Sequence, residues 1–557
     1  MKEVGDVDAA FDALGPLGRY NLVQFFFLLI TAWPVAFNML SIVFQGQSNP
    51  FQCAHYNYNL TMSSNTDYPK YKFHSSCKIE VTDHNSSFMF ENGTCSEFDV
   101  VYELPKDRSF VSEFNLVCDR EYLIGMTQTV FNVGQLIGVF AFPYFADRYG
   151  RRPVYIINAL LSLLSALGIA CSFNYEMLLA FKALLGFFEQ GSEVAIVSAA
   201  AEICSTRYRA PLFAFGGALS WALACLTLAP MSYVLREYSW KIHQFAICGS
   251  YFSILVAVVL LDESLRWLSV NGKTKEVMKI LEKASRWNNV EAQHVKDAYL
   301  NIRYDNENKR DTEELSLLTE KHMAAGELES TTVKPVRFVD LFTNRLLRAH
   351  TIFVIFAWFF NSLTYYALVL MSSTLHGDLY LNFSLSIVVE FPAAVYCHRF
   401  LDKFGRRKSF ALFSFISGVF LIGTGLVRNF APDENILLLI LTSIGRLGVT
   451  GSFTIIYMYT PELFPTNVRN MGMGVGYLAA RIGGMIAPYG ELLMKHLVYA
   501  PGLLMGISNL MLSVAPYFLP ETTGRQLPQT LDDIMSWKDK NNTNDKENKL
   551  KCMKEGT

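Results

Sequence analysis

Two ionisable residues stand alone inside apolar stretches that are long enough to cross a membrane. Glu390 lies in SLSIVVEFPAAVY, and Arg481 lies in a separate stretch, GVGYLAARIGG. An ionisable group inside a bilayer costs at least about 2.5 kcal/mol on insertion scales, so such a group faces a cavity or a partner and marks a pathway. One acid and one base in separate spans therefore predict a central site for a charged solute. The alternative is that Glu390 and Arg481 only neutralise each other.

A second group of ionisable residues lies in the apolar stretch 177–201, which contains Lys182, Glu189 and Glu193. Glu189 and Glu193 are four residues apart and share a helix face, where two carboxylates repel each other. We therefore expect one of them to bind a coupling ion or the cationic end of a cargo. The alternative is a salt bridge to Lys182 or Arg446. Amides that can hydrogen-bond to a cargo or between helices lie nearby: Gln128, Asn132, Gln135 and Gln190.

The composition indicates which solvent surrounds these stretches. Of 557 residues, 51% are hydrophobic and only 18% are charged, whereas a soluble protein has about 25% charged residues. The net charge of -2 gives no sign of nucleic-acid binding. Repeated apolar runs of about twenty residues predict an all-α membrane protein with the lipid bilayer as its solvent.

Twelve apolar runs are predicted to be transmembrane helices, six on each side of a charged loop. The N-terminal half covers 20–261, the central loop 262–346 and the C-terminal half 347–520, while 1–19 and 521–557 form the N-terminus and the tail. Within the central loop, the apolar spacing of 274–287 predicts a surface helix. The runs lie at 20–44, 122–145, 153–173, 177–201, 211–234, 243–261, 347–372, 379–400, 409–428, 435–460, 471–496 and 499–519.

The polar loop 45–119 inside the first half indicates the orientation. A loop with several cysteines and glycosylation sequons is typical of the extracellular side, where disulfides form. Most Lys and Arg residues of the short loops then fall on the cytosolic side, if both termini are cytosolic. Four cysteines permit three pairings, and the sequence does not choose between them. The cysteines are Cys53, Cys77, Cys95 and Cys118, and the sequon asparagines are Asn59, Asn85 and Asn92.

The two halves repeat the same landmarks in the same order. Asp-Arg-Tyr-Gly-Arg-Arg at 147–152 follows the second run, and Asp-Lys-Phe-Gly-Arg-Arg at 402–407 follows the eighth. Such duplication predicts two six-helix halves that rock about a site at the middle of the membrane. The other repeated landmarks are Glu202 with Arg209, Glu462 with Arg469, Glu263 with Arg266, and Glu521 with Arg525.

These loops also predict a mechanical device, which we call the latch. Gly150 and Gly405 permit a tight turn, and the arginines beside them can bridge to Glu202 and Glu462. Such bonds would hold the cytosolic side closed and would break as that side opens. The alternative is that the arginines only set topology. The latch residues are Asp147, Arg151, Arg152, Glu202, Arg209, Asp402, Arg406, Arg407, Glu462 and Arg469.

The paired loops, the large first loop, NLVCD at 115–119 and YTPELFPTNVR at 459–469 together resemble the organic cation, anion and zwitterion transporter family of the major facilitator superfamily. The resemblance covers nearly the whole chain and implies the major facilitator fold, with twelve transmembrane helices in two halves. One departure is visible: Pro143 and His398 stand where the family usually has a glycine that allows close helix contact.

The resemblance also implies that Glu390, Arg481, Trp358 and Tyr365 line the central cavity. The cation branch typically has an acid at the position of Arg481, and the anion branch tends to have a base near Glu390, so this combination resembles the carnitine/zwitterion branch. A quaternary ammonium could lie near Glu390 over an aromatic face, and a carboxylate could take two bonds from Arg481. Glu193 and Gln190 are further candidates to bind the cargo. For Trp358 and Tyr365, ordinary packing is the alternative.

We therefore expect a polyspecific plasma-membrane secondary transporter that carries small organic zwitterions and cations by alternating access. Carnitine-like, ergothioneine-like and quaternary ammonium solutes fit the charges. The alternatives are an organic-anion exchanger using Arg481, Lys182 and Arg446, a sugar porter, and a non-transporting receptor or scaffold. The sequence contains no metal-ligand spacing and no phosphate loop, so we expect neither an enzyme nor a cofactor. Coupling to Na⁺ or H⁺ through Glu189 or Glu193, exchange and uniport all stay open, as does the oligomeric state.

Overall fold

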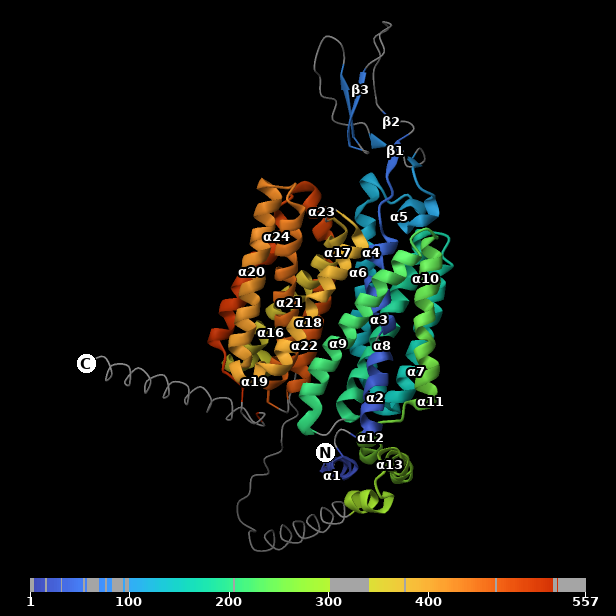
Figure 1. Cartoon of the computed structure of the whole chain (residues 1–557), viewed down its shortest axis with the longest axis vertical. Helices are drawn as coiled ribbons and strands as arrows, with labels where there is room; N and C mark the ends of the chain where they lie inside the picture. The colour runs from blue at the N-terminus through green and yellow to red at the C-terminus, as the bar shows by residue number, and fades with distance from the viewer. Residues whose placement is uncertain are drawn as a thin grey trace, which may run out of the picture.

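The computed structural model describes residues 5–15, 18–31, 33–53, 56–57, 70–75, 78–82, 94–95, 100–203, 206–300, 340–374, 377–465, 468–523 and 528. These residues form two groups of long, roughly parallel helices that stand side by side (Figure 1). The blue-to-green helices of the N-terminal half form one group, and the yellow-to-red helices of the C-terminal half form the other. The predicted division into two helical halves therefore holds for the bundle.

The helices of the N-terminal half follow the predicted apolar runs. Two of them, α6 (Tyr122–Tyr149) and α8 (Tyr175–Ile203), approach closely because glycines face the partner helix. A Cβ on Gly134 would lie 2.1 Å from the carbonyl oxygen of Ala183, and one on Gly186 would lie 2.1 Å from that of Phe131. The other helices are α2 (Arg19–Thr31), α3 (Trp33–Leu40), α4 (Ile42–Gln45), α7 (Arg151–Ala170), α9 (Thr206–Val234), α10 (Trp240–Gly249) and α11 (Ser253–Leu260).

The C-terminal half has the same design. Its helices α16 (Arg345–Leu370) and α22 (Arg469–Ile486) pack through Gly483, whose Cβ would lie 2.5 Å from the carbonyl oxygen of Phe359. Small residues let two backbones approach in this way inside a membrane. The other helices are α17 (Leu379–Val388), α18 (Glu390–Arg399), α19 (Leu401–Phe404), α20 (Arg406–Phe430), α21 (Asn435–Leu463), α23 (Tyr489–His496) and α24 (Ala500–Val514).

All twelve predicted runs are helical in the described part of the chain, but not all are apolar enough to be recognised as spans. Nine described helical segments are long and apolar enough to cross a membrane by length and composition. The helix α8 is not among them, and it contains Lys182, Glu189 and Glu193. The charges that suggest chemistry thus weaken the hydropathy signal of the helix that holds them, and the count of twelve spans stays a prediction.

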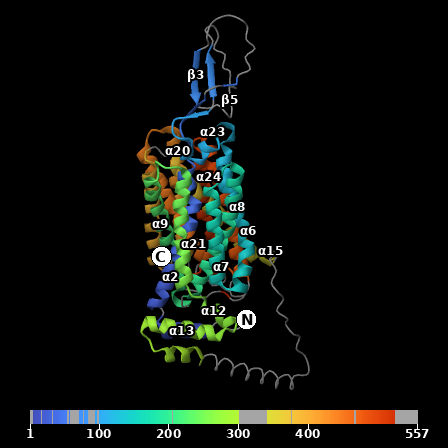
Figure 2. The same ribbon diagram turned by 90° about the vertical axis from the view of Figure 1, so that its right-hand side faces the viewer.

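Short strands gather at one end of the bundle, which we call the strand end (Figures 1 and 2). They belong to the predicted extracellular loop, so the loop adds β-structure to an otherwise helical chain. Cys118, beside this end, is disulfide-bonded, whereas Cys77 and the three sequon asparagines lie outside the described residues. The antiparallel pairs are β1 (Phe51–Cys53) with β6 (Val100–Tyr102), β2 (Tyr56–Asn57) with β5 (Thr94–Cys95), and β3 (Lys70–Ser75) with β4 (Lys78–Thr82).

The opposite end, which we call the α13 end, carries a small helical layer beneath the N-terminal half (Figure 2). It contains α12 (Leu265–Val270), the predicted α13 (Thr274–Asn288) and the helical residues 292–300. The acidic N-terminus forms α1 (Gly5–Leu14), whose apolar residues recur at helical spacing and pack into this layer. The buried residues of α1 are Val7, Ala10, Phe11 and Leu14.

The two halves touch along α6 and α22, and along α9 with α17 and α18. The Thr129 hydroxyl of α6 donates to the carbonyl oxygen of Met485 at 2.9 Å, and the Asn132 amide donates to that of Gly484 at 3.0 Å. Closer to the strand end, Lys495 forms an ion pair with Glu121. Each of these contacts joins one half to the other on the strand-end side of the bundle. Aromatic contacts between the halves add to them: Phe44 with Tyr380 and Phe383, and Tyr233 with Tyr380.

Candidate functional site

Arg481 and Glu193 form an ion pair that joins the two halves. Arg481 lies on α22 and Glu193 on α8, and the guanidinium Nη2 lies 2.9 Å from the carboxylate Oε2. The other terminal nitrogen of Arg481, Nη1, donates to Gln135 Oε1 of α6 at 2.8 Å. The Arg481 side chain is 10% exposed and that of Glu193 is 31% exposed, so the carboxylate is the more accessible partner. A charged solute that reaches the pair can compete for either partner.

Aromatic residues of the C-terminal half lie near this ion pair. Tyr366, Tyr457 and Tyr477 all interact electrostatically with Arg481 and Glu193. Behind them, the centre of the Trp358 ring lies 4.4 Å from the centre of the Tyr457 ring and 5.1 Å from the centre of the Tyr477 ring. We call Trp358, Tyr366, Phe453, Tyr457 and Tyr477 the aromatic cluster.

Trp358, which the family resemblance implied to line the central cavity, is packed inside this cluster. Its indole nitrogen donates to Thr460 Oγ1 at 2.9 Å, and its side chain is fully buried. The indole therefore has a satisfied polar edge and covered faces, which is the packing arrangement that the sequence left open. Tyr457 and Tyr477 were not singled out from the sequence, although both interrupt their apolar runs with a hydroxyl.

A second ion pair joins Glu390 of α18 to Arg446 of α21 within the C-terminal half. Glu390 Oε1 accepts from Arg446 Nη2 at 2.6 Å and from Nε at 3.2 Å. It also accepts from the Tyr365 hydroxyl at 3.0 Å, and the Arg446 guanidinium lies 5.2 Å from the centre of the Tyr365 ring. The side chains of Arg446 and Glu390 are only 1% and 4% exposed. This pair is therefore buried and has its counter-charge already in place.

The alternative that Glu390 and Arg481 neutralise each other does not hold, because Glu390 pairs with Arg446 and Arg481 pairs with Glu193. For Glu193, the alternative of a salt bridge to Lys182 or Arg446 does not hold either, since its partner is Arg481. Partner choice depends on how each helix is rotated about its axis, and spacing along one chain segment does not reveal this.

Two consecutive tyrosines of α16 connect the two ion pairs. Tyr365 donates to Glu390, and Tyr366 interacts with Arg481. The Tyr365 hydroxyl also accepts from the indole nitrogen of Trp221 of α9 at 2.7 Å, which is a further bond between the halves. Tyr365 therefore contacts the buried pair and the other half at once.

Glu189 lies in a separate polar network within the N-terminal half. Its Oε1 accepts from Asn38 Nδ2 at 2.8 Å and from the Tyr251 hydroxyl at 2.9 Å, and Lys182 attracts it electrostatically. Its other oxygen has no hydrogen-bond partner among the described residues, and Glu189 is 1% exposed. Gln190 Oε1 is buried and likewise has no partner in the described part of the chain. The described residues contain no group of three or more His, Cys, Asp or Glu that could hold a metal ion.

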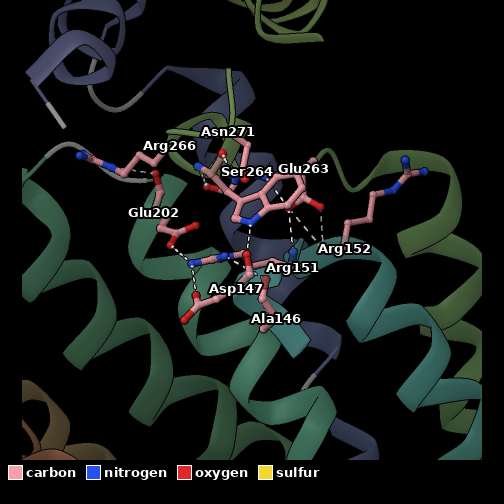
Figure 3. A network of polar contacts seen from close by, with 10 residues as sticks. Ala146, Asp147, Arg151, Arg152, Glu202, Glu263, Ser264, Arg266 and Asn271 are labelled. Carbon is pink, nitrogen blue, oxygen red and sulfur yellow. Dashed lines mark hydrogen bonds and ion pairs between the residues drawn. The ribbon is translucent and has the colours of Figure 1, made fainter. Parts of the chain in front are cut away.

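The first latch loop forms a compact network at the α13 end (Figure 3). Arg151 Nη2 lies 2.8 Å from Glu202 Oε1 and 3.0 Å from Asp147 Oδ1. Glu263 Oε1 accepts from the backbone amide of Arg151 at 3.0 Å, and the Trp267 indole donates to the carbonyl oxygen of Asp147 at 2.8 Å. Burial raises the pKa of the Glu263 carboxyl above its ordinary value, although hydrogen bonds from the backbone amides of Ser264, Arg151 and Arg152 partly oppose this shift. Glu263 thus closes the loop against the start of α7.

The second latch loop repeats this network in the C-terminal half. Arg406 Nη1 lies 2.6 Å from Asp402 Oδ1, and its Nε lies 3.3 Å from Glu462 Oε2. Glu521 Oε1 accepts from the backbone amide of Arg406 at 2.9 Å. The turn glycines Gly150 and Gly405 have φ of 105° and 91°, so both stand where side chains are disfavoured. The duplication predicted from the sequence therefore extends to individual bonds.

The structure bears out part of the latch geometry and corrects the rest. The predicted bridges from Arg151 to Glu202 and from Arg406 to Glu462 are confirmed. Arg152 and Arg407 instead donate to main-chain carbonyls, those of Val258 at 2.6 Å and of Leu519 at 3.3 Å, because each points toward the end of a neighbouring helix. All of these bonds lie within one half, so they brace each half; their role as a latch between halves stays a prediction. Arg469 donates to the Pro461 carbonyl at 2.8 Å, and the Arg209 side chain lies outside the description.

The sequence missed the role of Glu263 and Glu521. Both were recognised as repeated landmarks, but the sequence did not show that their carboxylates accept from the backbone amides of the latch loops. The signal was present, because an acid recurs at the same place after the sixth and the twelfth run.

Comparison with known proteins agrees with this architecture. Residues 51–531 match the model of the family described as Sugar (and other) transporter. The chain is 29% identical over 540 residues to the Organic cation transporter protein of Drosophila melanogaster, covering 94% of both chains. It is 30% identical to Solute carrier family 22 member 16 of Xenopus laevis, covering 77% of this chain and 71% of the relative. It is also 30% identical to Organic cation/carnitine transporter 2 of Homo sapiens, covering 77% of this chain and 72% of the relative.

Solved structures show the fold. The xylose transporter XylE from E. coli in a partially occluded inward open conformation superposes with a TM-score of 0.57 at 15% identity, covering 95% of this chain and all of the other. The proton:xylose symporter XylE bound to 6-bromo-6-deoxy-D-glucose gives 0.54 at 17% identity, covering 76% of this chain and 94% of the other. At these identities the likeness concerns the fold alone. The protein is thus a multi-pass membrane transporter and not an enzyme, and the chain belongs to solute carrier family 22 of the major facilitator superfamily, the family of the organic cation and carnitine transporters that it matches.

Proposed function

We propose that the chain is a plasma-membrane secondary transporter of small organic zwitterions and cations, and that its cargo binds at the Glu193–Arg481 pair. One observation carries this proposal: an acid from one half and a base from the other meet beside an aromatic cluster. A site shared between rocking halves is what alternating access requires.

The chemistry of the site favours a dipolar cargo. The planar guanidinium of Arg481 can donate two parallel bonds to a carboxylate, which an ammonium group cannot do. Glu193 can face the cationic end, and the faces of Tyr457 and Tyr477 can add cation–π contacts of about 0.5–2 kcal/mol. The matched relatives named as organic cation and carnitine transporters support the same class. Gln190, buried with an unpartnered oxygen, is a further candidate to bind cargo.

Glu390 supports this site from behind. Its carboxylate already has Arg446 as counter-charge, so it acts on the cargo through Tyr365, whose ring it fixes by a hydrogen bond. Trp358 acts in the same way, since it is buried behind Tyr457 and Tyr477.

The orientation belongs to the same proposal. The strand end is extracellular and glycosylated at Asn59, Asn85 and Asn92, and both termini and the α13 end are cytosolic. The loop cysteines pair with one another, and the latch residues control opening toward the cytosol. Glu189 is the candidate for coupling to H⁺ or Na⁺, because its carboxylate is buried with one oxygen unpartnered.

Uptake of labelled compounds into cells tests the function. Carnitine, ergothioneine, tetraethylammonium and para-aminohippurate are offered to cells that carry the wild type, Arg481→Ala, or Arg399→Ala as a control at an exposed arginine. Surface biotinylation corrects each rate for the amount of protein. We expect the first three compounds to accumulate and Arg481→Ala to lose the two zwitterions selectively. Accumulation of para-aminohippurate alone would favour the organic-anion exchanger instead, and no uptake by surface-expressed protein would favour a receptor.

A further inference from the structure

The Glu193–Arg481 pair affects the step in which the empty carrier reorients its site across the membrane after releasing its cargo. The inference rests on the function proposed above. Every alternating-access cycle includes a step in which the site, loaded or empty, passes from one side of the membrane to the other. In that step, water is excluded from the site on both sides.

In this step, an empty site leaves the charge of Arg481 without water and without a cargo carboxylate to compensate it. A guanidinium stays protonated at every physiological pH, so Arg481 cannot become neutral when water leaves. A buried charge without a partner is strongly destabilising, and the carrier would stall wherever water still reaches it. With cargo bound, the carboxylate of a zwitterion provides the missing negative charge. Without cargo, some group of the protein must provide it.

Glu193 is the group that the structure places there. Gln135 also bonds to Arg481, but it is neutral. Glu390 is held by Arg446, and Glu189 is bonded to Asn38 and Tyr251. Within the described part of the chain, Glu193 is the acid that forms an ion pair with Arg481.

The exposure of Glu193 fits a partner that cargo displaces. Its side chain is 31% exposed, whereas Glu390 in the other pair is 4% exposed. A solute can therefore reach the Glu193 carboxylate, while the Glu390–Arg446 pair is closed to it. Since the pair joins α8 to α22, it also holds the two halves together at the site while no cargo is present.

We propose that Glu193 is the counter-ion of the empty carrier: it neutralises Arg481 while the unloaded site reorients, and it yields Arg481 to the cargo carboxylate on binding. The unloaded protein can then return on its own, so the carrier performs net transport rather than obligatory exchange. A cargo with both charges replaces both members of the pair, with its carboxylate on Arg481 and its cation on Glu193.

Removing the negative charge separates the two half-cycles. In Glu193→Gln, loaded carrier still crosses, because the carboxylate of the zwitterion pairs with Arg481 and its cation faces the rings of Tyr457 and Tyr477. Empty carrier does not cross, because Arg481 is left unpaired. The variant is therefore an obligatory exchanger for zwitterions. It also loses transport of a cation without a carboxylate, which supplies no partner for Arg481.

Efflux from preloaded cells tests this inference. Cells are loaded with labelled carnitine, and its exit is followed into buffer with and without unlabelled carnitine outside. We expect similar rates for the wild type under both conditions. For Glu193→Gln we expect the rate without external carnitine to fall at least about tenfold, while exchange is largely retained. Glu176→Gln, the same change at an exposed position of α8, should behave as the wild type.

A further variant guards against a trivial loss of folding. Glu193→Asp keeps the negative charge and should keep net efflux. The inference is overturned if Glu193→Gln slows both efflux conditions by the same factor, or if Glu193→Asp is also an obligatory exchanger. The proposed function fails separately, when the wild type itself moves no zwitterion.

Discussion

Replacing one member of the Glu390–Arg446 pair should cost more stability than replacing both. In Glu390→Leu, the guanidinium of Arg446 stays in a site where it is 1% exposed and loses the carboxylate that it contacts at 2.6 Å. Removing one partner of a buried ion pair typically costs about 3–5 kcal/mol, because the other charge is left uncompensated. Arg446→Leu should cost a similar amount, since of its bonds within the described residues the Glu390 carboxylate then keeps only the one from Tyr365.

The double variant removes both charges together. Replacing a buried ion pair with apolar side chains of similar size is often close to neutral. The Tyr365 hydroxyl loses its acceptor, which costs about 1–3 kcal/mol, although it keeps its bond from Trp221. We therefore expect Glu390→Leu with Arg446→Leu to be more stable than either single variant.

The apparent melting temperature of the detergent-purified protein measures this order. Glu176→Leu and Arg399→Leu, at exposed positions, are the matched controls and should melt close to the wild type. A double variant that is as unstable as the two single losses added together would show that the two charges do not stabilise each other. Single variants that melt with the wild type would show that water reaches Glu390, which would restore its direct role as a cargo ligand.

Three further predictions concern the α13 end. Gly150→Ala should lower the free energy of unfolding by about 1–3 kcal/mol, because φ is 105° and ψ is 161° at Gly150, a backbone region open almost only to glycine. The control is Gly249→Ala within a helix, where the added Cβ meets nothing within 4 Å, and this variant should melt at the temperature of the wild type. Burial raises the pKa of the Glu263 carboxyl, so its protonated form stabilises the fold at low pH, and this stability is lost as the pH rises through the raised pKa. The melting temperature of the wild type relative to that of Glu263→Gln should therefore rise on acidification. Melting temperatures of the two proteins that change in parallel with pH would contradict this. Phe11→Ala should weaken docking of α1 by about 3–5 kcal/mol, and protease should then cut the N-terminal segment faster; an unchanged cleavage rate would mean that α1 is not held by this contact.

Features set by short-range pattern were predictable from the sequence. Apolar runs located the helices, and the apolar spacing of 274–287 predicted α13. The repeated Asp-x-x-Gly-Arg-Arg loops predicted the turns at Gly150 and Gly405, because only the local backbone decides where a glycine is required. The bridge from Arg151 to Glu202 followed in the same way, since both residues end up at the same end of adjoining helices.

Features set by the rotation and tilt of helices were not predictable. Whether Arg481 faces Glu390 or Glu193 depends on how each helix is rotated about its axis, and apolar runs in a membrane carry little periodicity to fix this rotation. The docking of α1 was not predicted either. The N-terminus was noted only as a terminal segment, although Phe11 and Leu14 follow the spacing of a helix that buries one face.

The hydrogen bond from Trp221 to Tyr365 makes the fluorescence of Trp221 sensitive to the contact between the two halves. The bond ties an indole of α9 to α16 across the boundary between the halves. Whenever the halves part there, this indole exchanges a fixed hydroxyl for solvent, and its emission shifts to longer wavelength. With the remaining tryptophans of the seven replaced by phenylalanine, the colour of a single ring would report each passage of the carrier in real time, without any attached dye.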